Sequence, residues 1–322
     1  MKAAVIYENG GPDVLRYEDV PDPECPDGWM LIDVETISIE GGDLLARAGS
    51  PPPSVPHIVG YLAAGTVLEV GAGVEDRGVG DRVVSLNAAG SHASRRAVPA
   101  MATWPIPDGL DAASAACVPV ALGTAQECLF TAGNLQAGQT ALIHAGAGGV
   151  GMAAIQLAKH AGATVLSTAS SNEKLERLKE FGLDHGINYA SEDFVERTRE
   201  LTDGRGADLI LDSVGGKNLV DSIRALAYRG TLVSVGVAGR AGSSIEARDL
   251  WAQNQTLRGV FLGGALLTEY RRVHAMIAEM FERVASGEVR VEIARPFPLA
   301  EAAAAHAYIE SRQAFGRVVL TP

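Results

Sequence analysis

The sequence predicts an α/β protein of two domains, in which a doubly wound parallel sheet is joined to a second, β-rich domain. The chain has 322 residues, enough for two domains that each bury a core. Before residue 120, short apolar runs alternate with turns rich in Gly and Pro, a pattern typical of a β-rich, partly barrel-like domain. From Thr140 onward, apolar runs alternate with helical patterns, which predicts parallel strands joined by crossover helices.

The β-rich domain is expected to span residues 1–120. Near its end the pattern changes from short apolar runs between turns to apolar runs that alternate with helical patterns. Its strands are predicted where apolar runs lie between turn signals such as "PDPECPDG" and "GSPPPSVP". These runs are residues 30–34, 65–70 and 82–86.

The parallel sheet is expected within residues 121–264, and its elements alternate along the chain. A helix over 172–182 would place Leu175, Leu178 and Phe181 on one face and end at Gly182. The other predicted elements are a helix over 149–162 and strands in 140–145, 164–169, 185–189, 207–216 and 230–236.

Residues 265–322 return to a mixed character. The stretch 268–287 predicts a helix that ends at Gly287, and residues 317–322 predict a closing strand. A helical tail that ends in a strand fits a C-terminus that packs back on the first domain.

Composition and charge exclude several classes of function. The formal net charge is -12 and Lys and Arg do not cluster, so no nucleic-acid partner is expected. The most apolar stretch is broken by Pro119 and Gly123, so no membrane partner is expected either, and the N-terminal apolar run is too short for a signal peptide. Cys25, Cys117 and Cys128 are scattered, which favours a reducing cytoplasm and neither a disulfide framework nor a zinc cluster.

A complete G-x-G-x-x-G motif is formed by Gly146, Gly148 and Gly151 in "HAGAGGVG". It follows a predicted strand and opens a predicted helix, which is the context of a Rossmann dinucleotide site. The first glycine is expected to allow the tight turn, the second to let the backbone approach a pyrophosphate, and the third to let helix and strand pack closely. Free N–H groups at the helix start would hold the phosphate charge.

The residues after the second strand indicate which dinucleotide binds. An NAD site usually carries an acid there, about 20 residues after the loop. Residues 168–171 carry none, and Ser170 and Lys174 suit a 2′-phosphate, so the expected cofactor is NADPH. Lys174 also has a second interpretation, as a solvated residue in the first turn of the helix.

Several segments together resemble the medium-chain dehydrogenase/reductase superfamily, in its zinc-independent quinone-oxidoreductase-like branch. They include "MKAAVIYENGGPDVLRYEDVP", "HAGAGGVGMAAIQLAKHAGATV", "DSVGG", "GTLVSVG" and "SRQAFGRVVLTP". The resemblance implies a GroES-like catalytic domain, built from 1–120 and completed by 265–322, around the central Rossmann domain, with a cleft between them. It also implies a homodimer that pairs through the edge strand near 257–261.

The resemblance extends the set of cofactor residues beyond the glycine motif. It implies that Ser170, Lys174 and Tyr189 face the 2′-phosphate, that Thr124 lies near the nicotinamide and that Arg317 keeps a cation close to the cofactor cleft. The further cofactor contacts that we expect are Gly149, Val150, Ser213, Val235, Gly236 and Phe261.

The substrate half departs from the pattern of that family. Glu40 stands where Asn is common, Leu62 where an acid is common, and His92 and Gln126 where aromatics are frequent, while Asp43 is retained. We therefore expect a substrate pocket that differs from the typical quinone pocket of that family.

The candidate catalytic groups are Glu40, Asp43, Tyr61 and His92, and each has a structural alternative. Glu40 and Asp43 could cap the helix indicated by "GGDLLARAG", Tyr61 could be a core aromatic, and His92 could be a surface-loop residue. His144 is interpreted as strand packing beneath the cofactor, and Arg317 is one candidate for polarising a developing enolate.

The resulting hypothesis is a metal-free, NADPH-dependent oxidoreductase. Hydride transfer would reduce a quinone or the activated C=C bond of an enone or enoyl substrate, so the partner is a small hydrophobic carbonyl or quinone. The alternative is an NADPH-binding protein with little or no turnover, in a structural or regulatory role.

Overall fold

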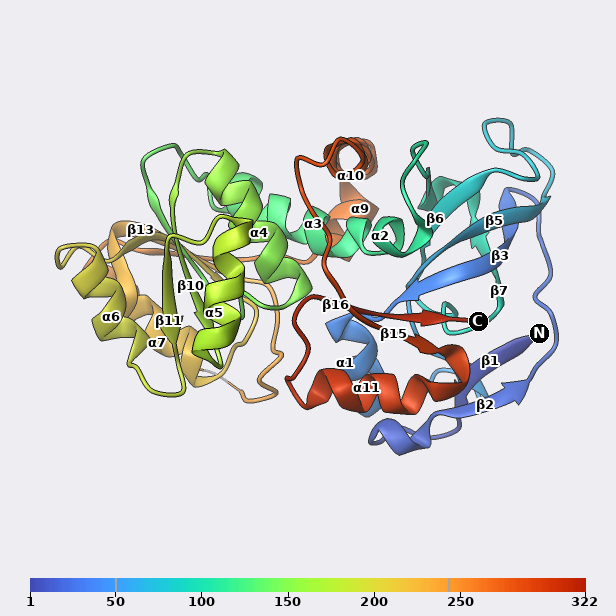
Figure 1. Cartoon of the computed structure of the whole chain (residues 1–322), viewed down its shortest axis with the longest axis horizontal. Helices are drawn as coiled ribbons and strands as arrows, with labels where there is room; N and C mark the ends of the chain where they lie inside the picture. The colour runs from blue at the N-terminus through green and yellow to red at the C-terminus, as the bar shows by residue number, and fades with distance from the viewer. Residues whose placement is uncertain (50, 243) are drawn as a thin grey trace. The chain divides into compact units, whose positions relative to one another are not determined.

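The computed structural model describes residues 1–49, 51–242 and 244–322, and the chain divides into two compact units (Figure 1). The first unit combines Met1–Pro119 with Ala278–Pro322, and the second is Val120–Ile277. The second unit continues past residue 264 because Ile277 packs on α3 (Val118–Gln126): a Cβ at Gly123 would lie 3.2 Å from Ile277 Cγ1. The domain bounds expected from the sequence stay a prediction.

The first unit is built on a seven-stranded sheet with the order β15-β16-β3-β5-β6-β8, and β7 pairs with β3. The predicted strands over 30–34, 65–70 and 82–86 are confirmed, since they lie in β3, β5 and β6. Met30, Ile32, Val67 and Val83 from these strands are buried in one cluster. The strands are β3 (Trp29–Ser38), β5 (Leu62–Val70), β6 (Arg82–Leu86), β7 (Arg95–Pro99), β8 (Thr103–Pro105), β15 (Ile293–Pro298) and β16 (Arg317–Thr321).

The C-terminal strand closes this unit. β16 pairs antiparallel with β3, with Val319 opposite Ser38 and Leu320 opposite Ile37, which confirms that the C-terminus packs back on the first domain. Helix α10 (Tyr270–Ala285) lies within the predicted 268–287 and is followed by Gly287, whose φ of 77° is left-handed. Helices α1 (Gly41–Gly49) and α11 (Ala302–Glu310) share an apolar cluster with Ile37 and Leu320.

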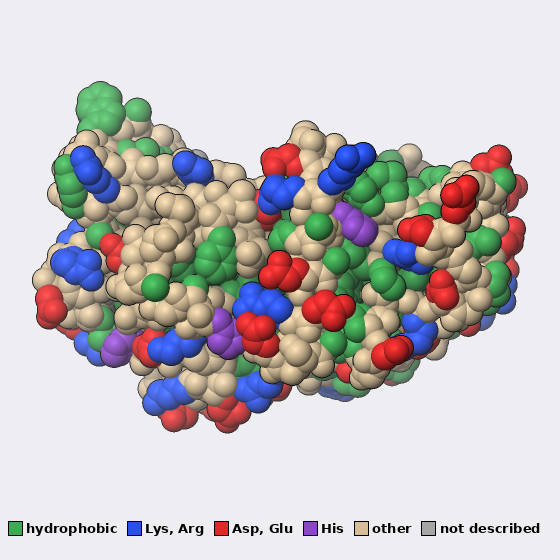
Figure 2. All heavy atoms as spheres, turned by 90° about the horizontal axis from the view of Figure 1, so that it is seen from above, with side chains coloured by type: hydrophobic (Ala, Val, Ile, Leu, Met, Phe, Trp, Pro, Cys, Tyr) green, Lys and Arg blue, Asp and Glu red, His purple; other side chains and the backbone are tan. Residues whose placement is uncertain are grey.

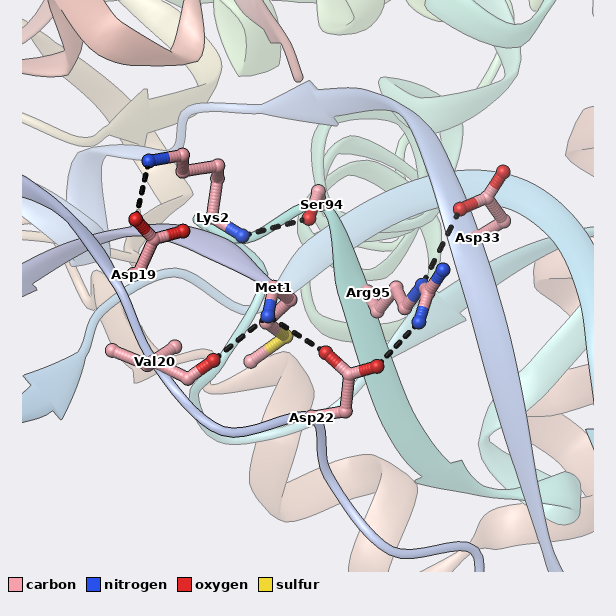
Figure 3. A network of polar contacts seen from close by, with 8 residues as sticks. All are labelled: Met1, Lys2, Asp19, Val20, Asp22, Asp33, Ser94 and Arg95. Carbon is pink, nitrogen blue, oxygen red and sulfur yellow. Dashed lines mark hydrogen bonds and ion pairs between the residues drawn. The ribbon is translucent and has the colours of Figure 1, made fainter.

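The N-terminus is held in a small sheet of β1 (Lys2–Ile6), β2 (Arg16–Asp19) and β4 (His57–Ile58). The amino group of Met1 donates to the Val20 carbonyl and the Asp22 carboxylate, both at 2.7 Å (Figure 3). Arg95 on β7 pairs with the same Asp22 and lies 4.0 Å from Asp33 on β3. Most of these groups are exposed, so each pair adds little to stability, but together they tie β1 to β7.

The second unit is a six-stranded parallel sheet with the order β11-β10-β9-β12-β13-β14. The order reverses between β9 and β12, so the predicted doubly wound Rossmann sheet is confirmed. Figure 1 shows α4 and α5 on one side of the sheet and α6 and α7 on the other. The elements are β9 (Thr140–Ile143), α4 (Gly149–His160), β10 (Thr164–Ala169), α5 (Asn172–Leu178), β11 (His185–Asn188), α6 (Phe194–Leu201), β12 (Ala207–Asp212), α7 (Lys217–Ala225), β13 (Leu226–Ser234) and β14 (Thr256–Gly259).

The helix predicted over 172–182 is shorter than expected. α5 ends at Leu178, and a 3-10 turn over Lys179–Phe181 leads to Gly182 with φ 101°. The predicted glycine stop is confirmed, because Gly182 adopts the left-handed conformation that ends a helix.

On the face seen in Figure 2, basic and acidic side chains are interspersed. In the part of the chain that the structure describes, every helix is too short or too polar to cross a membrane. Cys25, Cys117 and Cys128 are all free thiols.

Candidate functional site

The predicted cofactor residues of the second unit lie at one edge of its sheet. Parallel strands end at the same edge, and all but Thr124 and Lys174, which lie in helices, follow the carboxyl end of a strand. The topology therefore gathers segments that are far apart in the sequence. The glycine loop follows β9, Ser170 follows β10, Tyr189 follows β11, Ser213 follows β12, Val235 and Gly236 follow β13, and Phe261 follows β14.

Space, and not backbone freedom, explains the first and third glycines of the motif. The chain turns through the left-handed region at Ala145, with φ 54°, and none of the three motif glycines has a positive φ. Gly146 nevertheless lies in a tight turn, which is closed by the hydrogen bond from the Gly148 N–H to the Ala145 carbonyl at 3.0 Å. A Cβ at Gly146 would lie 2.1 Å from Ser167 Oγ, and one at Gly151 would lie 2.4 Å from the Ala145 carbonyl oxygen. Both sites exclude a side chain.

Gly148 is different, because a Cβ there would fit in ordinary van der Waals contact. Among the described residues other than its chain neighbours, the nearest atom to that position is the Ala145 carbonyl oxygen, at 3.4 Å. Gly148 is also the N-cap of α4 and supplies no side chain to cap it. The N–H groups of Gly149, Val150 and Gly151 thus begin a helix whose end is open to an anion, and this geometry fits a pyrophosphate.

The end of β10 carries no acid, and its polar groups have distinct tasks. Ser171 caps α5 by accepting a hydrogen bond from the Lys174 N–H at 3.3 Å. Thr168 is buried with its hydroxyl turned into the protein, while Ser170 and Lys174 are half-buried. Burial lowers the pKa of the Lys174 amine, while the adjacent Glu173 raises it. Lys174 lies in the first turn of α5, so both of its interpretations stay predictions. The donors suit a 2′-phosphate.

Three further predicted cofactor residues sit in different surroundings. Thr124 is buried in α3, just before a π-helical turn over Glu127–Ala132. Tyr189 is 44% exposed and Phe261 is 77% exposed, so both are available to a ligand.

Arg317 lies in the first unit on β16, where it pairs with Glu40. Its Nη2 donates to the Ser38 hydroxyl at 2.7 Å, to the Ile39 carbonyl at 2.9 Å and to the Glu40 carboxylate. Burial raises the pKa of the Glu40 carboxyl, and the Arg317 guanidinium opposes that rise. The sequence did not indicate Ser38 or Cys117, whose sulfur lies 3.4 Å from the Ser38 hydroxyl oxygen.

Asp43 caps α1, as one of its two interpretations predicted. Its Oδ2 accepts the Glu40 N–H at 2.8 Å, while Glu40 uses its own carboxylate on Arg317 and Ser38 and does not cap the helix. Burial, with the like charge of Glu40, holds the pKa of Asp43 well above its ordinary value. Within the described residues, its Oδ1 is buried and has no hydrogen-bond partner.

Tyr61 is the one candidate catalytic side chain of the first unit that is not fully buried. Its hydroxyl lies over α1, only 2.6 Å from the position of a Cβ on Gly42, so that glycine makes room for it. Burial and the charges of Glu40 and Asp43 raise the pKa of the phenol, which keeps its proton at neutral pH. Arg96, which the sequence did not indicate, donates to the Tyr61 carbonyl at 3.2 Å.

His92 belongs to a separate buried cluster, so its interpretation as a surface-loop residue was wrong. Its Nε2 lies 3.0 Å from His306 Nε2, and its Nδ1 lies 3.3 Å from Ser91 Oγ. His306 in turn accepts from Arg47 at 3.0 Å. Burial lowers the pKa of His92 well below its ordinary value, so the ring is neutral. The loop can fold inward here because Gly60, with φ 89°, has no side chain. A Cβ on Gly60 would lie 2.0 Å from His92 Nδ1.

In the described ranges, no three side chains of His, Cys, Asp or Glu gather as a metal site. Leu62, which replaces a common acid, is buried in the core of the first unit.

Two family models match the chain. The alcohol dehydrogenase GroES-like domain matches residues 26–131, and the zinc-binding dehydrogenase matches residues 149–280. The chain is similar to the 2-haloacrylate reductase of a Burkholderia species, with 36% identity over 332 residues, 99% of this chain and 98% of the relative.

Solved structures resemble the whole chain. The quinone oxidoreductase of Escherichia coli complexed with NADPH has a TM-score of 0.95 and 30% identity, over 100% of both chains. A mycobacterial protein complexed with NADPH has a TM-score of 0.95 and 36% identity, again over 100% of both chains.

Proposed function

The chain belongs to the quinone-oxidoreductase-like branch of the medium-chain dehydrogenase/reductase superfamily, and we therefore infer that it is an NADPH-dependent oxidoreductase that reduces a quinone or an activated C=C bond. The observation that carries this function is the open N-terminus of α4 beneath Gly148, next to a β10 end without an acid. When bound, NADPH supplies a hydride.

We propose that backbone and side chains of the second unit divide the cofactor between them. The N–H groups of Gly149, Val150 and Gly151 would hold the pyrophosphate, where the dipole of α4 adds to their attraction. Ser170, Lys174 and Tyr189 would hold the 2′-phosphate. The other proposed cofactor residues are Thr124, Gly146, Gly148, Ser213, Val235, Gly236, Phe261 and Arg317.

We propose Tyr61 as the group that touches the substrate oxygen. As an activated C=C bond takes a hydride at its β-carbon, negative charge develops on the carbonyl oxygen, and a donor placed there lowers the barrier. Tyr61 keeps its proton and is partly exposed, whereas Glu40, Asp43 and His92 are buried in bonds with other protein groups. Water can protonate the α-carbon, so no further acid is needed.

The first test is titration with NADPH and NADH, followed by NADPH oxidation against quinones, enones and enoyl thioesters. We expect NADPH to bind at least about 10-fold more tightly than NADH, from one or two charge-assisted hydrogen bonds to the 2′-phosphate. Turnover of one substrate class is expected. Tight binding without turnover of any class would favour the binding-protein alternative, and a preference for NADH would contradict the assignment of Ser170 and Lys174.

The role of Tyr61 is tested by Tyr61→Phe. We expect kcat/KM for the acceptor to fall by about 10- to 100-fold, the range of a lost transition-state hydrogen bond, with an unchanged Kd for NADPH. Gln255→Met, which removes a buried hydrogen-bonding side chain of the second unit, is a control for general destabilisation. An unchanged kcat/KM in Tyr61→Phe would remove Tyr61 from the mechanism.

We propose that the reaction uses no metal. Dialysis against a chelator should then leave activity unchanged, and elemental analysis should find zinc well below one atom per chain. Stoichiometric zinc whose removal abolishes turnover would contradict this.

We propose a homodimer that pairs through β14. In the described residues β14 is the outermost strand and pairs with β13 alone, which leaves its outer edge for a second strand. Leu257 on β14 is 37% exposed and adds apolar surface. Light scattering should show a dimer, and Leu257→Asp should shift it toward monomer. A monomeric wild-type protein would contradict the proposal.

We also propose a cytoplasmic location, which three free thiols favour. Fractionation of the source cells tests it, and recovery in an extracytoplasmic fraction would contradict it.

A further inference from the structure

His144 is a buried residue at the base of the glycine loop that the proposed chemistry does not use. It directly follows β9 and is 1% exposed. Its Nδ1 lies 3.1 Å from Thr168 Oγ1 at the end of β10, and its Nε2 lies 3.0 Å from Ser222 Oγ on α7. The ring also meets Phe194 of α6 edge-on, with ring centroids 4.8 Å apart. One side chain at the end of β9 thus contacts the end of β10 and two helices.

The hydrogen-bond partners determine which nitrogen of His144 carries the proton. Ser222 donates its only hydroxyl hydrogen to the Asn218 carbonyl, at 2.7 Å. Its oxygen therefore accepts a hydrogen bond from His144 Nε2–H. Burial lowers the pKa of His144 to about 4, although Asp212 raises it, so the ring is neutral at pH 7. A neutral ring protonated at Nε2 has a lone pair at Nδ1, which accepts the Thr168 hydroxyl hydrogen.

Thr168 connects His144 to the glycine loop. Because the Thr168 hydroxyl donates its hydrogen to His144, its oxygen is free to accept the Ala145 N–H, at 3.2 Å. The Thr168 carbonyl accepts the Gly146 N–H at 2.9 Å. Thr168 therefore holds two successive N–H groups at the start of the loop.

Ala145 needs such support because its φ of 54° is in the left-handed region, which is unfavourable for an alanine. Its carbonyl accepts the Gly148 N–H at 3.0 Å and lies under Gly151, where no Cβ would fit. The direction of the Ala145 peptide therefore sets where the first turn of α4 begins. That turn carries the N–H groups assigned to the pyrophosphate.

We propose that His144 is a positioning residue for the cofactor's pyrophosphate, which acts through Thr168 to hold Ala145 left-handed and so aims the first N–H groups of α4. The proposal rests on the proposed function, because it requires NADPH at this loop. His144 itself does not touch the cofactor.

Two substitutions of His144 distinguish the contribution of the Nδ1 hydrogen bond from that of the Nε2 hydrogen bond. The amide of an asparagine stands as many bonds from Cα as Nδ1, so His144→Asn keeps a group near Thr168 and loses Ser222. The amide of a glutamine stands as far as Nε2, so His144→Gln keeps Ser222 and loses Thr168. A role in packing alone predicts similar effects for both variants.

The measurements are Kd for NADPH, Kd for 2′-AMP and the melting temperature. We expect His144→Gln to raise the Kd for NADPH by about 10-fold, and His144→Asn by about threefold, as one lost supporting hydrogen bond would do. 2′-AMP carries the 2′-phosphate but no pyrophosphate, so its Kd should change less than about twofold in both. In steady-state assays of His144→Gln, KM for NADPH should rise with kcat retained at saturation.

Thr168→Val is the second variant, because it removes the same hydroxyl with little change of shape and remains informative if His144→Gln does not fold. Gln255→Met is the matched control: Gln255 donates to the Ile223 and Leu226 carbonyls, so its loss should lower the melting temperature without changing the Kd for NADPH.

Equal losses of NADPH affinity in His144→Gln and His144→Asn would overturn the inference, as would a loss of 2′-AMP affinity in step with that of NADPH. A wild-type protein that binds neither ligand would overturn the proposed function together with the inference. Wild-type binding with unchanged affinity in His144→Gln and Thr168→Val would overturn the inference alone.

Discussion

The two units of the molecule use polar groups in opposite ways. In the second unit, the candidate pyrophosphate site consists of backbone N–H groups at the start of α4, which no side chain caps. In the first unit, the candidate catalytic groups satisfy one another: Glu40 pairs with Arg317, and His92 with His306. Only Tyr61 keeps an exposed face among them.

This difference shows why one half of the site could be read from the sequence and the other could not. A helix end and a missing Cβ are local properties of a short segment. A buried charge pair depends on two segments that can lie far apart in the sequence. Replacing one member leaves the other as a buried charge without a partner. Glu40 departs from the family pattern where Asn is common, and Arg317 is the partner that makes a carboxylate tolerable there.

The largest expected effect comes from breaking that pair. In Arg317→Met, the Glu40 carboxylate would stay buried without its partner, and we expect the free energy of unfolding to fall by about 3–5 kcal/mol. Urea denaturation measures it. The double variant Glu40→Gln/Arg317→Met should recover most of the loss. An Arg317→Met protein as stable as the wild type would show that the pair is not what holds the first unit's polar cluster.

The His92–His306 pair predicts a dependence of stability on acid. Burial lowers the pKa of His306 to about 3 and that of His92 well below its ordinary value, so both rings stay neutral in the folded state. The unfolded chain takes up their protons near pH 6.5. The stability they support is therefore complete above pH 6.5 and is lost as the pH falls, by at most about 1.4 kcal/mol per pH unit for each histidine.

Denaturation of the wild type and of His92→Leu/His306→Leu between pH 7 and pH 5 measures this slope. The double variant should be less stable than the wild type at pH 7, but its free energy of unfolding should decrease less as the pH falls. Parallel curves for the two proteins would contradict the assignment of neutral buried rings.

Two glycine substitutions in the second unit distinguish a glycine needed for packing from one next to the proposed pyrophosphate site. Gly151→Ala places a Cβ against the Ala145 carbonyl, so we expect a loss of about 1–3 kcal/mol in unfolding free energy from overpacking. Gly148→Ala places its Cβ in ordinary van der Waals contact with the Ala145 carbonyl oxygen, so stability should hold while NADPH affinity falls. Thermal melting and NADPH titration of both variants test the contrast. Equal stability of the two proteins would refute the packing role of Gly151.

The smallest effect is expected from Ala145→Gly. A glycine adopts the left-handed conformation at no steric cost, so the free energy of unfolding should rise by up to about 1 kcal/mol, less the entropy that glycine adds to the unfolded chain. Differential scanning calorimetry measures the change. A clear loss of stability would show that the Ala145 side chain contributes packing that outweighs its strain.

The sequence by itself determined the Rossmann sheet, the glycine loop, the open helix start and the missing acid after β10. These follow from residues close together in the chain, because hydrophobic period, glycine spacing and helix ends are local.

Tertiary structure alone decided how the side chains pair. Glu40 and Arg317 are 277 positions apart in the sequence, and His92 and His306 are 214 positions apart. His144 and Ser222 are 78 positions apart. Whether such a group is a surface residue, a helix cap or a buried partner depends on its desolvation and on neighbours from distant segments. Those are set by packing, because the energy of a charge or hydrogen bond depends on distance in space and on the removal of water.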